Sequence, residues 1–168
     1  MIKKDELIDE IYKLAFKYEA ELGSCPQCVL AALYETLDIG NPETIKAIDS
    51  LAGGTSLSTE GTCGALIGGL VAISSIVGRE YKDFKEGKRK RLVFKYSKKL
   101  YDKFIKEYGS PLCKGVHKKI FGRTFNLLDK NDYAEFEKAG AHVDKCTSVS
   151  GNVAKWAAEI IINDILKK

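Results

Sequence analysis

Apolar residues recur at three- and four-residue spacing along most of this chain, and this periodicity constrains the fold more than any other feature. In residues 3–22, for example, Leu7, Ile11 and Tyr18 share one helical face. Lys, Glu, Leu, Ile and Ala dominate the long segments, and only three prolines interrupt them. We therefore expect an all-α fold, a compact bundle of about six to seven helices.

Glycine, proline and capping residues divide the periodic pattern into helices. Gly23 is expected to end the first helix, and Ser24, with Pro26 after it, to cap the second. Asn131 is expected to cap a short helix over residues 131–139. With no internal repeat or linker and 168 residues, the sequence predicts a single helical domain over residues 1–168.

Two features bear on location and partners. The longest apolar stretch, residues 64–78, is shorter than the roughly 20 residues of a membrane span, and the N-terminus lacks a secretory-signal pattern, so we expect a cytoplasmic protein without a membrane span. Residues 82–106 contain eleven Lys or Arg and three Asp or Glu. We interpret this run as a solvated helix face, and nucleic acid is not expected as a partner.

The cysteines carry the functional signal. Cys25, Cys63, Cys113 and Cys146 each fall at, or within one turn of, the expected start of a different helix. Free backbone N–H groups at a helix start stabilise a thiolate, the form that binds metals and attacks disulfides. Any one buried cysteine is most simply a small hydrophobe, but four in the same context favour a shared site. Four thiolates are also the usual ligand set of an iron–sulfur cluster.

Four segments resemble the C_GCAxxG_C_C family of redox-active proteins, which is named for four cysteines around a glycine-rich motif. The resemblance covers roughly residues 20–166, and similar domains occur in split-Soret cytochromes. The segments are Cys25-Pro26-Gln27-Cys28, Cys63-Gly64-Ala65-Leu66-Ile67-Gly68, Tyr108-Gly109 with the following Cys113, and Cys146 with the Ala-rich segment 153–158. The resemblance implies that Cys25, Cys63, Cys113 and Cys146 are the four cysteines of a redox site, and in split-Soret cytochromes an iron–sulfur centre accompanies c-type haem.

The sequence around these motifs leads to more specific expectations for cofactor binding. Cys28 is extra to the family pattern and makes a Cys-x-x-Cys pair with Cys25, so either could act as a ligand. Gly64 and Gly68 lie on one helical face, where a cofactor or another helix could approach closely. No covalent haem is expected, because Val29 follows Cys28 where haem attachment requires histidine.

Two histidines are further candidates. His117 follows Cys113 by four residues, on the same helical face, and His142 precedes Cys146 by four residues. Either histidine could complete a metal site or donate a hydrogen bond to a cluster sulfur, although a lone histidine is more often an ordinary surface residue.

Three functions remain open on the sequence alone. The first is electron transfer or redox sensing by an iron–sulfur cluster, with [2Fe–2S] the favoured type, bound by one chain or shared across a homodimer. The second is thiol–disulfide exchange with Cys25 and Cys28 as the catalytic pair. The third is a non-redox binding module with structural cysteines. The first two functions require a redox partner, either a protein or a small-molecule oxidant or reductant, and the sequence does not identify it.

Overall fold

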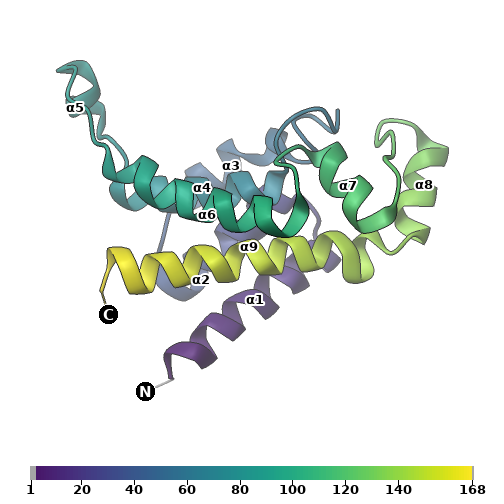
Figure 1. The fold of residues 1–168 in the computed structure, drawn as a ribbon, viewed down its shortest axis with the longest axis horizontal. Helices are drawn as coiled ribbons and strands as arrows, with labels where there is room; N and C mark the ends of the chain where they lie inside the picture. The colour runs from purple at the N-terminus through teal and green to yellow at the C-terminus, as the bar shows by residue number, and fades with distance from the viewer. Residues whose placement is uncertain (1–2, 168) are drawn as a thin grey trace.

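The computed structural model describes residues 3–167, and this part of the chain is helical, with nine α-helices and no strand beyond one isolated bridge (Figure 1). The all-α prediction is confirmed. The α-helices are α1 (Lys4–Glu21), α2 (Cys25–Leu37), α3 (Pro42–Ala47), α4 (Gly64–Val77), α5 (Tyr81–Lys85), α6 (Leu92–Tyr108), α7 (Cys113–Phe121), α8 (Lys130–Lys138) and α9 (Cys146–Ile160). Shorter turns are the 3₁₀-helix η1 (Asp49–Leu51) and the π-helices η2 (Ala141–Lys145) and η3 (Ile161–Ile165).

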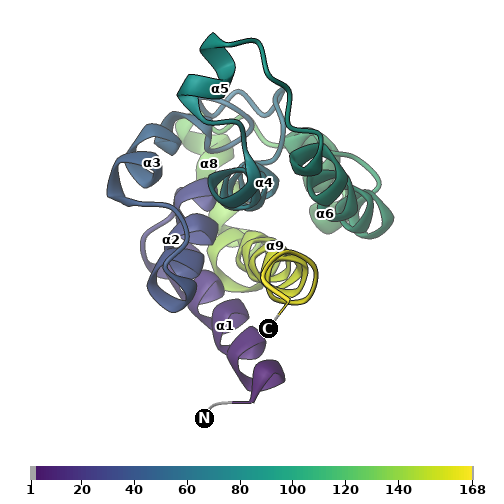
Figure 2. The same ribbon diagram turned by 90° about the vertical axis from the view of Figure 1, so that its left-hand side faces the viewer.

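Helix α9 lies at the centre of the bundle. It packs against α1, α2, α4 and α6, which surround it in the end-on view of Figure 2. Val153, Ala154 and Ala157 on α9 have no exposed surface, and neither does Ile11 on α1. Small residues on the central helix let four neighbours approach it closely, so most of the apolar core forms around this one element.

Helix α4 uses glycines to pack against three neighbouring helices. A Cβ atom at Gly68 would lie 2.5 Å from the Pro26 carbonyl oxygen of α2. One at Gly69 would lie 2.7 Å from both Leu100 of α6 and Val153 of α9. The close approach of another helix that was expected at Gly64 and Gly68 is present, since both lie against α2, and Gly69 adds a contact with α6 and α9.

The expected number of helices, six to seven, was too low. Helix α5 was missed because its five residues are too few to show apolar periodicity. The basic helix, expected to follow Gly87 directly, begins only at Leu92, after four consecutive cationic residues that repel one another within one helical turn. No helix within residues 3–167 is both long and apolar enough to cross a membrane.

Of the two expected caps, Ser24 occupies the cap position of α2 without a capping bond, and Asn131 is not the cap of α8. Ser24 has a left-handed backbone with φ of 63° and makes no capping bond; its hydroxyl donates instead to Asp49 Oδ1 at 2.8 Å. Helix α8 is capped by Asp129, whose Oδ1 accepts from the backbone N–H groups of Asn131 and Asp132 at 3.0 and 2.9 Å. A carboxylate one residue before the helix accepts these bonds more readily than the amide of Asn131, which lies inside the helix.

Candidate functional site: a cavity lined by four cysteines

The four family cysteines all lie where the sequence placed them. Cys25, Cys113 and Cys146 are the first residues of α2, α7 and α9, and Cys63 immediately precedes α4. All four line one cavity of about 280 Å³, although 38, 50 and 33 positions separate them along the chain. The fold therefore brings four distant helix starts to a single space.

Backbone hydrogen bonds hold two of the cysteine loops side by side. The N–H of Cys63 donates to the Pro111 carbonyl at 2.8 Å, and the N–H of Cys113 donates to the Gly61 carbonyl at 2.9 Å. These bonds flank an antiparallel bridge between Thr62 and Leu112. The starts of α4 and α7 are therefore fixed relative to each other by main-chain contacts.

Two glycines make room for the cysteine side chains. Gly54 has a left-handed backbone with φ of +71°, and a Cβ atom there would lie 2.6 Å from the Cβ of Cys113. A Cβ atom at Gly64 would lie 2.5 Å from the Sγ of Cys25. Larger residues would displace either cysteine. Gly64 and Gly68 both face α2, and contact of either glycine with a cofactor stays a prediction.

Burial, rather than helix-start position, controls the ionisation of these cysteines. It raises the pKa of the Cys63 thiol to about 11, against the opposing effect of hydrogen bonds from the backbone of Ala65 and Leu66. Burial likewise raises the pKa of Cys25, Cys113 and Cys146 above the ordinary thiol value, and the nearby Glu19 carboxylate adds to this effect. The expectation that helix starts would yield thiolates is corrected: in the metal-free chain these residues are neutral thiols.

Cys28 has different surroundings. It is buried, its thiol donates to the Gly23 carbonyl at 2.8 Å, and it is not among the residues that line the cavity. Burial raises the pKa of its thiol, and the nearby Glu19 carboxylate raises it further. All five cysteines are free, so Cys25 and Cys28 form no disulfide.

Glu19 is a buried carboxyl in the cavity wall that sequence reasoning missed. It is only 3% exposed, and its Oε2 accepts a hydrogen bond from the Ser150 hydroxyl at 3.2 Å. Burial raises the pKa of Glu19, and the charge of His142 opposes this. One sequence signal was present, since Glu19 continues the stripe formed by Ile8, Ile11 and Ala15 at the spacing of a buried helix face.

Both histidines also line the cavity. The Nε2 of His117 lies 3.6 Å from the Sγ of Cys113, and its Nδ1 is buried without a hydrogen-bond partner within the described chain. Burial lowers the pKa of His117 to about 4, so its ring is neutral. His142 connects two acids: its Nδ1 lies 2.7 Å from Glu137 Oε1 and its Nε2 lies 3.7 Å from Glu19 Oε1.

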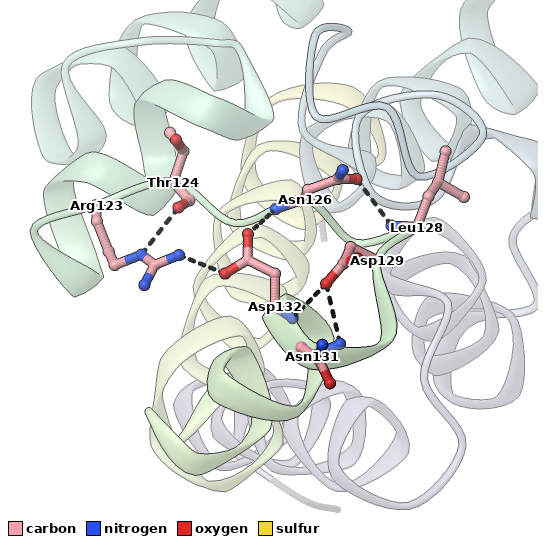
Figure 3. Close-up of polar contacts among 7 residues, drawn as sticks. All are labelled: Arg123, Thr124, Asn126, Leu128, Asp129, Asn131 and Asp132. Atoms are coloured by element: carbon pink, nitrogen blue, oxygen red, sulfur yellow. Dashed lines mark hydrogen bonds and ion pairs between the residues drawn. The ribbon is translucent and has the colours of Figure 1, made fainter.

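The loop between α7 and α8 closes one side of the cavity. Figure 3 shows that Arg123 pairs with Asp132, which also accepts from the backbone N–H of Asn126. The Arg123 guanidinium lies 4.3 Å from the ring centre of Phe125, which is buried. These contacts fix the loop so that Leu127 lines the cavity.

Within residues 3–167, no three His, Cys, Asp or Glu side chains lie close enough together to hold a single metal ion. The four cysteines instead border a space that they share with Glu19, His117 and His142. The fold and the site together define an all-helical protein with a cavity lined by four cysteines.

Residues 23–160 match the family described as "Putative redox-active protein (C_GCAxxG_C_C)", and the chain belongs to that family. The match contains all four cysteines of the cavity as well as Cys28. No curated protein and no solved structure matches the chain.

Proposed function

We propose that this protein binds an iron–sulfur cluster in the cavity and uses it for electron transfer or redox sensing. Cys25, Cys63, Cys113 and Cys146 would be the ligands. The observation that carries the proposal is that four thiols from four helix starts border one cavity of about 280 Å³. When bound, a cluster of this kind accepts and releases single electrons.

The residues around the cavity fit such a group. Thiolates are the usual ligands of iron–sulfur clusters, and the backbone N–H groups of Ala65 and Leu66 already favour the thiolate form of Cys63. The His117 Nδ1 has no partner in the described chain, so a polar or anionic group in the cavity would satisfy a buried atom that is otherwise costly to desolvate.

The remaining side chains would control the environment of the cofactor. Apolar residues such as Leu127, Phe136 and Val149 line the cavity and exclude water. Glu19 would place a carboxyl group next to the cofactor, and burial raises the pKa of that group. The neutral His117 ring carries a single N–H, and on Nδ1 that N–H would stabilise negative charge on the bound group.

Thiol–disulfide exchange by Cys25 and Cys28 is less well supported. An attacking cysteine needs substantial thiolate at ambient pH, whereas burial raises the pKa of both thiols. In addition, Cys28 points its thiol at the Gly23 carbonyl and does not line the cavity.

Anaerobic purification followed by a visible spectrum and analysis of iron, sulfide and zinc tests the proposal directly. We expect absorption bands between about 320 and 600 nm with matching iron and sulfide content. The ratio of iron to protein then decides whether the cluster is of the [2Fe–2S] type.

Serine variants identify the ligands. Cys25→Ser, Cys63→Ser, Cys113→Ser and Cys146→Ser should each lose most of the colour, whereas Cys28→Ser is the matched control and should keep it. A colourless, iron-free protein in which only Cys25 and Cys28 change their redox state would contradict the proposal and support disulfide exchange. Full colour in the Cys113→Ser variant would exclude a cluster held jointly by all four cysteines.

A further inference from the structure

Residues 79–95 form a basic arm that stands away from the helical body. The arm contains α5 and the start of α6, and both ribbon views show α5 projecting beyond the other helices (Figures 1 and 2). It lies at the opposite end of the molecule from α7 and α8, which border the cysteine cavity. An occupant of the arm would therefore leave the cavity accessible.

The arm exposes large apolar side chains. Tyr81 is 75% exposed, Phe84 57%, Leu92 55% and Phe94 73%. Single exposed apolar residues are common on proteins, but Tyr81, Phe84 and Phe94 line one groove and so form a patch of the kind that marks an interaction surface.

Positive charge surrounds this patch. Residues 79–95 contain eight Lys or Arg and three Asp or Glu, and two of the acids are already paired with Lys88 and Lys90. A groove of about 1100 Å³ runs along the arm, and no acidic residue of the described chain lines it. Its lining includes Arg79, Arg89, Lys90 and Arg91 together with Tyr81, Phe84 and Phe94. The occupant must therefore be anionic and able to accommodate apolar side chains.

We propose that the basic arm binds the surface of an anionic phospholipid bilayer. Its lysines and arginines would contact the headgroup phosphates, while Tyr81, Phe84, Leu92 and Phe94 would enter the boundary between headgroups and acyl chains. Long cationic side chains suit this arrangement because their stems lie in the apolar layer while the charged ends remain hydrated.

The aromatic rings favour lipid over single-stranded nucleic acid. Bases stack on free ring faces. Here Tyr81 and Phe84 stack on each other, with ring centres 6.5 Å apart, and the Arg79 guanidinium covers Phe84 at 4.7 Å from its ring centre. Insertion into a bilayer surface requires exposed apolar area rather than free ring faces, and the arm provides that area.

Vesicle co-sedimentation of the full chain tests the proposal. The probes are vesicles of phosphatidylcholine alone and vesicles that also contain about 30% phosphatidylglycerol, a composition chosen for its negative surface potential. We expect binding to the anionic vesicles only, with an affinity that falls as salt rises. The triple variant R89Q/K90Q/R91Q should bind roughly 100-fold more weakly, because each cation near the surface contributes about a fivefold factor.

Two further variants separate the contributions. K13Q/K17Q/K119Q removes the same charge from exposed positions on α1 and α7 and should bind like the wild type. F84S/F94S should also bind weakly while keeping the salt dependence, because it removes apolar contacts and no charge. These are exposed side chains, so circular dichroism should show an unchanged fold for each variant.

The proposal would be overturned if R89Q/K90Q/R91Q and K13Q/K17Q/K119Q bound anionic vesicles equally well. It would also be overturned if the wild type bound neutral vesicles as tightly as anionic ones. Tight binding of a single-stranded oligonucleotide that the R89Q/K90Q/R91Q variant loses while vesicles are ignored would overturn it as well. That last result would assign the arm to nucleic acid. None of these outcomes depends on whether the cavity holds a cluster.

Discussion

At the scale of single residues, the chemistry of the cavity depends on groups that the cysteine pattern does not reveal. Glu19 lies buried in the wall, and its charge raises the pKa of Cys25, Cys63, Cys113 and Cys146. His117 lies against Cys113 with its other nitrogen unpartnered within the described chain. Glu19 acts on the thiols through its charge and His117 contacts one of them, so the roles of both side chains should be measurable without any cofactor.

Replacing Glu19 with Gln should speed the reaction of the cavity thiols with iodoacetamide in metal-free protein. Burial raises the pKa of Glu19, so the comparison is made at a pH above that pKa, where the neutral amide removes a negative charge that opposes thiolate formation. The pKa of these thiols then falls, and we expect their rate of reaction to increase roughly three- to tenfold, equivalent to up to about one pKa unit. Mass spectrometry of each cysteine would follow the rate.

Glu21→Gln is the matched control for this measurement, because Glu21 is exposed on the same helix. It should leave the rates unchanged. Equal rates in both variants and the wild type would mean that the charge of Glu19 does not reach the thiols.

Replacing His117 with Phe should reduce the acid sensitivity of the metal-free protein. Burial lowers the pKa of His117 from 6.5 to about 4, so as pH falls below 6.5 the unfolded chain takes up a proton that the folded chain does not. The free energy of unfolding therefore decreases through this window, by about 2 kcal/mol between pH 7 and pH 5. The H117F variant lacks this contribution and suits the surrounding aromatic rings.

Urea unfolding at several pH values measures the difference. The wild type should lose about 2 kcal/mol more stability than H117F as the pH falls from 7 to 5. Parallel stability curves for the two proteins would show that His117 is not held neutral in the folded state.

At the scale of elements, close contact between helices α2 and α4 fixes Cys25 relative to Cys63. The contact depends on Gly68, where an added Cβ would lie 2.5 Å from the Pro26 carbonyl oxygen and 2.9 Å from the Cβ of Val29. Backbone atoms and a Cβ cannot rotate away. At Gly69 the nearest atoms, at 2.7 Å, are the ends of the Leu100 and Val153 side chains, which can adjust.

Gly68→Ala should therefore destabilise the protein more than Gly69→Ala. Both gain about 1 kcal/mol of helix propensity, but overpacking at Gly68 costs roughly 1–3 kcal/mol more than at Gly69. Urea unfolding of the two variants would show the difference, and the G68A variant should also bind less iron, because α2 carries Cys25. A G68A variant as stable as G69A would mean that the two helices can separate without loss.

The elements also show what the sequence could predict. Apolar periodicity located the long helices, and the breaks between them placed four cysteines at helix starts, because both signals are local. The meeting of these helix starts at one cavity depends on tertiary packing. Helix α5 has too few residues for a periodic signal, and Asp129 rather than Asn131 caps α8. Glu19 was missed because its burial follows from the packing of α1 against α9, η2 and α2, a tertiary arrangement that one helical stripe does not specify.

At the scale of the whole molecule, two apolar clusters of unequal size meet at the cavity. The larger lies around α9 and includes buried residues of α1, α2, α4 and α6. The smaller contains only four buried residues, Phe125, Leu127, Phe136 and Ala141, with Phe121 and Cys146 packed against it. The part of the fold built on the smaller cluster has less buried apolar surface to hold it in place.

Removing the proposed cofactor should loosen this smaller part and leave the larger core unchanged. Cys113 and Cys146 lie at either end of the segment 113–146, so joint ligation of one cofactor would cross-link that segment to Cys25 and Cys63. Hydrogen exchange should therefore become faster by roughly ten- to a hundredfold in residues 114–145 of cofactor-free protein, with little change in the interior of α9. Cys146→Ser should reproduce this pattern, and Cys28→Ser should not. If exchange changed equally throughout the chain, or not at all, the four cysteines would not act together as one cross-link.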